Sequence, residues 1–142
     1  MTEFHYSAKA DNYSQAGSAS IAVKRELDAL GIDKALIRRV AVAMYEGEIN
    51  MVIHAGGGEI AVEVDDDKII ARLDDNGPGI PDIGLAMEEG YSTASEKIHE
   101  SGFGAGMGLA NMKRNCDILN IIPKPDGGMS ITMIFFITRR HF

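Results

Sequence analysis

Residues 46–82 read EGEINMVIHAGGGEIAVEVDDDKIIARLDDNGPGIPD, and residues 102–109 read GFGAGMGL. The first stretch begins inside an apolar run over 34–55, which predicts a largely buried helix ended by three consecutive glycines. It continues with two runs rich in β-branched residues, 59–64 and 68–73, and the three aspartates between them predict an antiparallel hairpin. A helix, a hairpin and two glycine-rich loops therefore form the centre of the predicted fold.

The segments on either side predict a sandwich of helices and strands. Residues 4–8 alternate in polarity as a short strand does, and residues 14–30 have the amphipathic spacing of a helix. Towards the end of the chain we expect a helix over about 107–116 and strands over 117–122 and 129–138. Because the first two helices follow one another, the predicted fold class is a two-layer α/β (α+β) sandwich. Its sheet is expected to be mixed and mainly antiparallel, with both long helices on one face.

The composition is that of a globular domain and excludes several functions. The chain has 142 residues, 45% of them hydrophobic, so we expect a single domain over 1–142. The net charge is −7, whereas a nucleic-acid-binding protein usually carries a large basic surface. The sequence contains no apolar run that predicts a membrane helix or a signal peptide. We therefore expect neither nucleic acid nor a membrane as partner. The single cysteine, Cys116, excludes an internal disulfide and favours a cytoplasmic location, and the four histidines have no metal-binding spacing.

Polar residues recur at every fourth position of the buried helix. Glu46, Asn50 and His54 form one stripe on a helix that is otherwise mostly apolar. The amide oxygen of Asn50 suits a hydrated Mg²⁺, and the carboxylate of Glu46 one turn away suits proton abstraction from an attacking hydroxyl or water. The alternative is a helix with one solvated edge. Glu48 points away from this stripe, and we expect it to be solvated.

The first glycine-rich segment has more features than a tight turn requires. Asp75 follows a strand almost directly, and Gly77 and Gly79 come next. A carboxylate at a strand end can accept a hydrogen bond from an exocyclic amine such as that of adenine, and the glycines let a planar base approach the backbone. A simple tight turn is the alternative.

The second glycine-rich segment has a glycine at every other position from 102 to 108, directly before a predicted helix. Such a loop can direct successive backbone N–H groups at an anion, with a helix N-terminus behind them, and this suits a di- or triphosphate. The alternative is a flexible loop before a capped helix. Because the P-loop and dinucleotide-binding signatures are absent from the chain, a nucleotide would have to be bound through another fold.

Together, E-x-x-x-N on a buried helix, D-x-G-x-G after a strand and G-x-G-x-G-L opening a helix resemble the GHKL (Bergerat-fold) ATP-binding superfamily. The N box corresponds to 46–55, the first glycine box to 74–82 and the second to 102–109, with a glycine-rich ATP lid over 83–106. The resemblance covers nearly the whole chain. Within the superfamily, the chain is similar to the RsbT/RsbW-type anti-sigma factor serine-protein kinases.

The resemblance implies a role for each matching residue. Asn50 would chelate Mg²⁺ between the phosphates of ATP, Glu46 would act as general base for a substrate serine, and Asp75 would bind the adenine amino group. The remaining ATP-binding positions that it implies are Gly77, Gly79, Ile80, Ser92, Thr93, Lys97, Gly102, Gly104, Ala105, Gly106, Met107, Gly108, Leu109 and Ser130.

The chain departs from the pattern of this superfamily at identifiable positions. Met129 stands where relatives carry a threonine that supports adenine, and Ser130 is the expected substitute. Residues 95–101 lengthen the lid relative to RsbT-like chains. Glu46 occupies a position at which histidine kinase domains usually have asparagine, which favours a serine kinase and leaves hydrolysis of ATP open.

The predicted function is that of a Mg-ATP-dependent serine-protein kinase which phosphorylates a small STAS-type anti-anti-sigma-like protein in a partner-switching pathway. One alternative is a nucleotide-gated binding protein that sequesters a sigma factor or activates a PP2C-type phosphatase, with a partner surface around Lys24 and Arg25. A simple ATPase is the other alternative. The resemblance also implies a homodimer.

Overall fold

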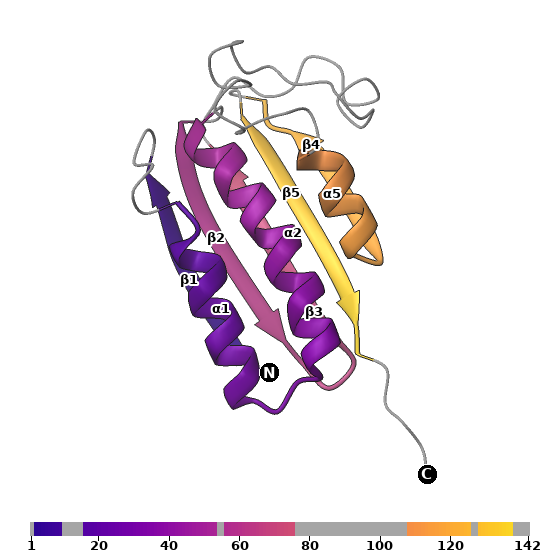
Figure 1. Ribbon diagram of the computed structural model, residues 1–142. Coiled ribbons are helices and arrows are strands. Elements are labelled where there is room, and N and C mark those ends of the chain that lie inside the picture. Colours follow the sequence, from indigo (N-terminus) through magenta and orange to yellow (C-terminus); the bar gives the residue numbers. More distant parts are fainter. Residues whose placement is uncertain (1, 10–15, 54–55, 76–107, 126–127, 138–142) are drawn as a thin grey trace.

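The helices and strands follow one another in the predicted order. The computed structural model describes residues 2–9, 16–53, 56–75, 108–125 and 128–137. These form β1 (Thr2–Lys9), α1 (Ser18–Ala29), α2 (Lys34–Ile53), β2 (Gly57–Val64), β3 (Lys68–Asp75), α5 (Gly108–Asn115), β4 (Ile118–Pro123) and β5 (Met129–Phe136). Figure 1 shows α2 running along the middle of the sheet.

The five described strands form one sheet in the order β1-β2-β3-β5-β4. Each pair of neighbouring strands is antiparallel, so the described part of the sheet contains no parallel pair. Alternate residues of β5 are buried, as expected when one face of a sheet packs on helices and side chains alternate between the faces. The buried set on this strand consists of Met129, Ile131, Met133 and Phe135.

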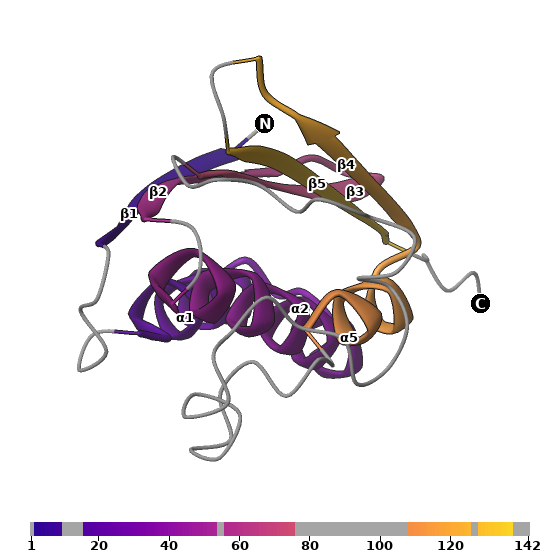
Figure 2. The same cartoon turned by 90° about the horizontal axis from the view of Figure 1, so that it is seen from above.

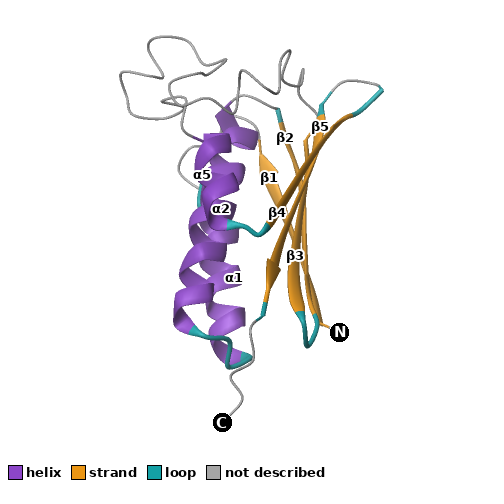
Figure 3. Cartoon of the chain, turned by 90° about the vertical axis from the view of Figure 1, so that its right-hand side faces the viewer, coloured by secondary structure: helices purple, strands orange, loops and turns teal. Residues whose placement is uncertain are grey.

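The three described helices cover the same face of the sheet, which confirms the two-layer sandwich (Figures 2 and 3). The core lies between the layers, where Val23 and Leu27 of α1 and Val40 and Met44 of α2 are fully buried. Asp33 begins α2 as expected, because its Oδ2 accepts hydrogen bonds from backbone N–H groups of the first helical turn, with Ala35 N at 3.1 Å.

The central hairpin extends two residues further than predicted at its open end. β2 begins at Gly57, and β3 continues to Asp75, so that Gly58 pairs with Asp75. A β-carbon at Gly58 would collide with the carbonyl oxygen of Asp74 and would lie 2.6 Å from Met51 Cε. Only glycine permits this close approach, and Asp75 is therefore held inside the sheet instead of in the loop that follows it.

Glu48 is not solvated, contrary to the expectation from its place on the helix. Only 2% of it is exposed, and its two carboxylate oxygens accept hydrogen bonds from Ala19 N and Ser20 N, each at 3.1 Å. These N–H groups belong to the first turn of α1, where no helical carbonyl can accept them. The N-cap residue of α1 is Gly17, which has no side chain that could accept these hydrogen bonds. Glu48 thus caps α1 from the neighbouring helix.

The substitution Glu48→Ala is expected to lower the free energy of unfolding by about 2–4 kcal/mol, because it leaves two buried backbone donors without acceptors. Urea denaturation measures this change. Glu48→Gln keeps one acceptor oxygen and should lie between alanine and wild type. The exposed Glu26 of α1 provides the control, since Glu26→Ala should change stability by less than about 0.5 kcal/mol. Equal stability of the Glu48→Ala and Glu26→Ala proteins would contradict the capping role.

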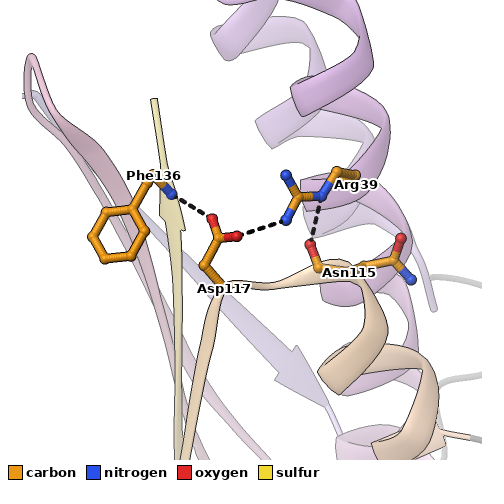
Figure 4. Close-up of polar contacts among 4 residues, drawn as sticks. All are labelled: Arg39, Asn115, Asp117 and Phe136. Carbon is orange, nitrogen blue, oxygen red and sulfur yellow. Dashed lines mark hydrogen bonds and ion pairs between the residues drawn. The ribbon is translucent and has the colours of Figure 1, made fainter. Parts of the chain in front are cut away.

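The C-terminal end of α5 is tied to both layers by Arg39 of α2 (Figure 4). Arg39 Nε donates to the carbonyl oxygen of Asn115 at 3.1 Å, and Arg39 Nη2 donates to Asp117 Oδ1 at 3.2 Å. The second oxygen of Asp117 accepts a hydrogen bond from Phe136 N at 2.7 Å. The guanidinium, the carboxylate and the strand end therefore fix the position of α5 beside α2 and β5.

Candidate functional site

Glu46 of α2 and the beginning of α5 lie together, although 62 residues separate them in the chain. Asn111 Nδ2 donates a hydrogen bond to Glu46 Oε1 at 3.2 Å. A β-carbon at Gly108, the first residue of α5, would lie 3.7 Å from Glu46 Oε2. Glu46 is half-buried, and the structure thus brings a carboxylate to the N-terminus of the helix that follows the second glycine-rich segment.

Gly47 lets α2 pack closely against the elements beside it. A β-carbon at this position would lie 2.5 Å from Leu73 Cδ2 of β3 and 3.4 Å from Met112 Sδ of α5. Alanine at this position would therefore require the end of the Leu73 side chain to move. Sequence reasoning did not single out Gly47. The available signal was a glycine inside a helix, where it costs about 1 kcal/mol relative to alanine and indicates close packing.

Asn50 follows Glu46 by one helical turn and is half-buried. Residues four apart lie on one face of a helix, so the two side chains share the face on which α5 begins. Both residues therefore lie where the sequence predicted a polar stripe. His54, the third residue of that stripe, lies outside the described residues.

Asp75 is held at the end of β3 by contacts from two other segments. It is 2% exposed, and its Oδ1 accepts a hydrogen bond from Met129 N of β5 at 2.9 Å. Its carbonyl oxygen accepts another from Lys124 Nζ at 2.8 Å. Gly128 has a φ of +86°, and a β-carbon there would collide with Asp75 O and lie 3.0 Å from Asp75 Oδ1. The carboxylate is thus fixed in place by a backbone that approaches within contact distance.

Lys124 and Gly128 were not predicted as part of the site. Their only sequence signal was a glycine-containing turn between the last two strands, which is common to most hairpins. Asn111 was also missed, because an asparagine in the second turn of a predicted helix has no distinctive pattern.

Ser130, the expected substitute for the threonine that supports adenine, lies on the opposite face of the sheet from Asp75. It pairs with Asp74, and paired residues in an antiparallel sheet lie on the same face. Asp74 and Asp75 are adjacent in the strand, so their side chains lie on opposite faces. Met129, the residue in place of the expected threonine, is 1% exposed and contributes its backbone N–H.

The remaining predicted positions divide into packed residues and residues that the structure does not describe. Leu109 is 7% exposed and belongs to the core cluster. Cys116, which was not among the predicted site positions, is also buried, and this burial raises the pKa of its thiol. The positions outside the described residues are Gly77, Gly79, Ile80, Ser92, Thr93, Lys97, Gly102, Gly104, Ala105, Gly106 and Met107.

The described residues contain no group of three or more His, Cys, Asp or Glu side chains that could hold a metal ion. In the same part of the chain, no helix combines the length and the apolar character needed to cross a bilayer.

Comparison with protein families identifies the class of protein. Residues 35–139 match the family described as histidine kinase-, DNA gyrase B- and HSP90-like ATPases, and the chain belongs to this family. The GHKL resemblance is therefore confirmed, and the family is one of ATP-using proteins.

Individual relatives confirm the narrower resemblance. The serine/threonine-protein kinase RsbT of Bacillus subtilis is 36% identical over 79% of this chain and 79% of its own length. An anti-sigma F factor of Caldanaerobacter subterraneus subsp. tengcongensis is 29% identical over 99% of this chain and 96% of its own. By this relationship the chain is a protein kinase of the RsbT and anti-sigma factor kind.

Solved structures confirm the fold. The match to the mycobacterial sensor histidine kinase MprB covers 94% of this chain and 97% of the MprB chain, with a TM-score of 0.55 and 18% identity. The match to a chain of the SiaB–SiaC complex from Pseudomonas aeruginosa covers 94% of this protein and 89% of that chain, with a TM-score of 0.57 and 14% identity.

Proposed function

We propose that this protein, a single domain over 1–142, is a Mg-ATP-dependent kinase that phosphorylates a serine of a small STAS-type regulatory protein and so switches the partners of that protein. The observation that carries the proposal is the placement of two carboxylates. Glu46 of α2 lies at the N-terminus of α5, and Asp75 is fixed at the end of β3. The end of β3 lies close to α2, because Gly58, which pairs with Asp75, packs against Met51 of that helix. ATP bound between them would have adenine at Asp75 and its phosphates towards α5.

The donor set suits a magnesium ion that is held mainly by the nucleotide. Asn50 offers one amide oxygen, and Mg²⁺ in phosphoryl-transfer sites keeps several waters and takes few protein ligands. When bound, the ion neutralises charge on the phosphates. Asn50 is the residue that would hold it.

Glu46 is the general base of this proposal. Its carboxylate accepts the proton of the substrate serine while the serine oxygen attacks the γ-phosphorus, and the bond from phosphorus to the β–γ bridging oxygen breaks to release ADP. The hydrogen bond from Asn111 leaves one carboxylate oxygen of Glu46 beside Gly108 and holds the rotamer. The N-terminal end of the α5 dipole favours negative charge on the transferred group.

The names of the relatives support the proposed partners. Anti-sigma F factors among them point to a STAS-domain anti-anti-sigma-like substrate, and a sigma factor or a PP2C-type phosphatase would be further partners. A homodimer and a cytoplasmic location are part of the same proposal, the latter supported by the buried free thiol of Cys116.

Titration calorimetry with ATP and Mg²⁺, followed by transfer from radiolabelled ATP to a purified STAS-type protein, tests the function. We expect saturable binding and label on a serine of the acceptor, with loss of transfer in EDTA. A stable nucleotide-dependent complex without transfer would favour the binding protein, and release of phosphate without an acceptor would favour the simple ATPase. No binding of ATP would contradict all three.

The substitution Asn111→Ala is expected to lower the rate of phosphoryl transfer roughly ten- to a hundredfold, because Glu46 loses the donor that orients it. The dissociation constant of ATP should stay within about twofold, since Asn111 lies outside the predicted nucleotide contacts. Initial rates and calorimetry separate these two effects.

Asn115→Ala is the matched control for this prediction. Asn115 Nδ2 donates to the carbonyl oxygen of Asn111 one turn earlier, so its removal takes a bond from the same helix without changing the donor to Glu46. If Asn111→Ala and Asn115→Ala slow transfer equally, Asn111 acts only through the stability of α5.

A further inference from the structure

A groove runs along the exposed side of the helix layer, between α1 and α2, and the proposed kinase site does not use it. Its volume is about 780 Å³. We call it the α1–α2 groove, and its lining consists of Ser20, Ile21, Lys24, Arg25, Asp28, Lys34, Ile37, Arg38, Ala41, Val42 and Tyr45. Most of these residues are exposed or half-buried, and Ser20 and Ile37 are the buried members of the lining.

One half of the α1–α2 groove is apolar and exposed. Ile21 is 61% exposed, Tyr45 43% and Val42 39%. The ring of Tyr45 lies beside Gly17, the residue before α1, where a β-carbon would be 3.0 Å from Tyr45 Cε2. An aromatic side chain beside two aliphatic ones is the composition of a binding anchor.

The other half of the groove is basic. It carries Lys24, Arg25, Lys34 and Arg38 against the single carboxylate of Asp28. In the part of the chain that the structure describes, none of these four cations takes part in an ion pair. The chain as a whole has a net charge of −7, so this surface has the opposite sign to the rest of the molecule. Its charge therefore complements an acidic partner and not a basic one.

The two halves lie at opposite ends of the groove. Residues 30–33 join α1 to α2, and so short a connection makes neighbouring helices antiparallel. The C-terminal half of α1 therefore lies beside the N-terminal half of α2, which places Arg25 and Asp28 near Lys34 and Arg38. Ile21 correspondingly lies near Val42 and Tyr45. A segment in the groove would meet apolar side chains at one end and cations at the other.

We propose that the α1–α2 groove binds an amphipathic helix of another protein, with apolar side chains against Ile21, Val42 and Tyr45 and carboxylates against the cations at the other end. A groove between two helices accepts a third helix through side chains at spacings of three and four. α1 has 12 residues and a length of about 18 Å, which matches about three turns of the bound segment.

Other occupants suit the surface less well. A nucleic acid or an anionic membrane would be attracted to the cations but repelled by the remaining charge of an acidic chain. A second copy of the chain would need an acidic helix that fits the apolar half. The exposed carboxylates of the described helices, Glu26 and Asp28, both lie on α1 itself, and Asp28 lines the groove.

Fluorescence anisotropy with a synthetic peptide tests the proposal on the whole chain. The probe is a labelled helix of about 14 residues with leucines along one face and glutamates clustered at one end. We expect saturable binding, with changes in amide chemical shift confined to α1 and α2. The double substitution Lys24→Glu and Arg38→Glu should weaken binding about tenfold or more, and Ile21→Ser should also weaken it.

The double substitution Lys9→Glu and Lys113→Glu is the matched control, because it makes the same change in net charge at exposed positions outside the groove. It should leave peptide affinity within about twofold. Equal weakening by both double variants, or equal binding of a scrambled peptide of the same composition, would overturn the proposal. Chemical-shift changes outside the two helices would overturn it as well.

Two further outcomes would assign the groove to another occupant and overturn the proposal. One is co-sedimentation with phosphatidylglycerol vesicles that depends on Lys24 and Arg38 while the peptide does not bind. The other is a homodimer, seen by analytical ultracentrifugation, that the groove substitutions dissociate. None of these readouts depends on ATP, so the result is independent of the proposed kinase activity.

Discussion

Replacing Glu46 by glutamine is expected to slow phosphoryl transfer by roughly 10²- to 10⁴-fold while the affinity for ATP stays within about twofold. Glutamine has the same shape and still offers an oxygen to Asn111 Nδ2, so the side chain keeps its position beside Gly108. It can no longer take the proton of the attacking hydroxyl. Single-turnover transfer from radiolabelled ATP, together with calorimetry, measures both quantities.

The control for this substitution is Glu26→Gln, which removes one carboxylate from an exposed position of α1. Its transfer rate should equal that of the wild type. A Glu46→Gln protein that phosphorylates its acceptor at the wild-type rate would show that Glu46 is not the base. A variant that fails to bind ATP would instead place Glu46 among the groups that hold the nucleotide.

The second large effect is expected at Asp75, where substitution by asparagine should weaken ATP binding by about 100-fold or more. Asparagine can keep an oxygen for Met129 N, so the strand end stays closed. Its amide group would present a donor to the amino group of adenine, which is also a donor. Calorimetry with ATP measures the loss, and thermal unfolding checks that the fold persists.

Asp74→Asn is a closely matched control, because Asp74 is the preceding residue and its side chain lies on the opposite face of the sheet with Ser130. Its affinity for ATP should remain within about twofold of the wild type. If the two substitutions weaken ATP binding equally, the loss reflects a general change in charge at the end of β3. Unchanged binding by the Asp75→Asn protein would remove Asp75 from the adenine site.

The order of helices and strands could be predicted because each has a local signal. The alternation in β3 and β5, the apolar spacing of α2 and the cap at Asp33 all depend on neighbours within a few residues. Glu46, Asn50 and Asp75 were found in the same way, since a polar residue in an apolar helix or at a strand end is visible in the sequence alone. Their roles stay predictions until ATP binding and phosphoryl transfer are measured.

The residues that were missed depend on contacts between distant segments. Glu48 looked like an ordinary charged helix residue, and only the packing of α1 against α2 reveals that it caps another helix. Asn111 becomes relevant because α5 lies beside α2. Ser130 was expected to take the place of the threonine that supports adenine, but the register between β3 and β5 places it on the opposite face from Asp75. Such a register cannot be read from composition.

The close contact at Gly47 has an evolutionary consequence. Because a methyl group there would meet Leu73 Cδ2 at 2.5 Å, alanine at position 47 requires the end of the Leu73 side chain to move. A lineage that acquires alanine at 47 would gain from a shorter side chain at 73. Substitutions at these two positions are therefore expected to compensate for one another, which couples the history of α2 to that of the central strand.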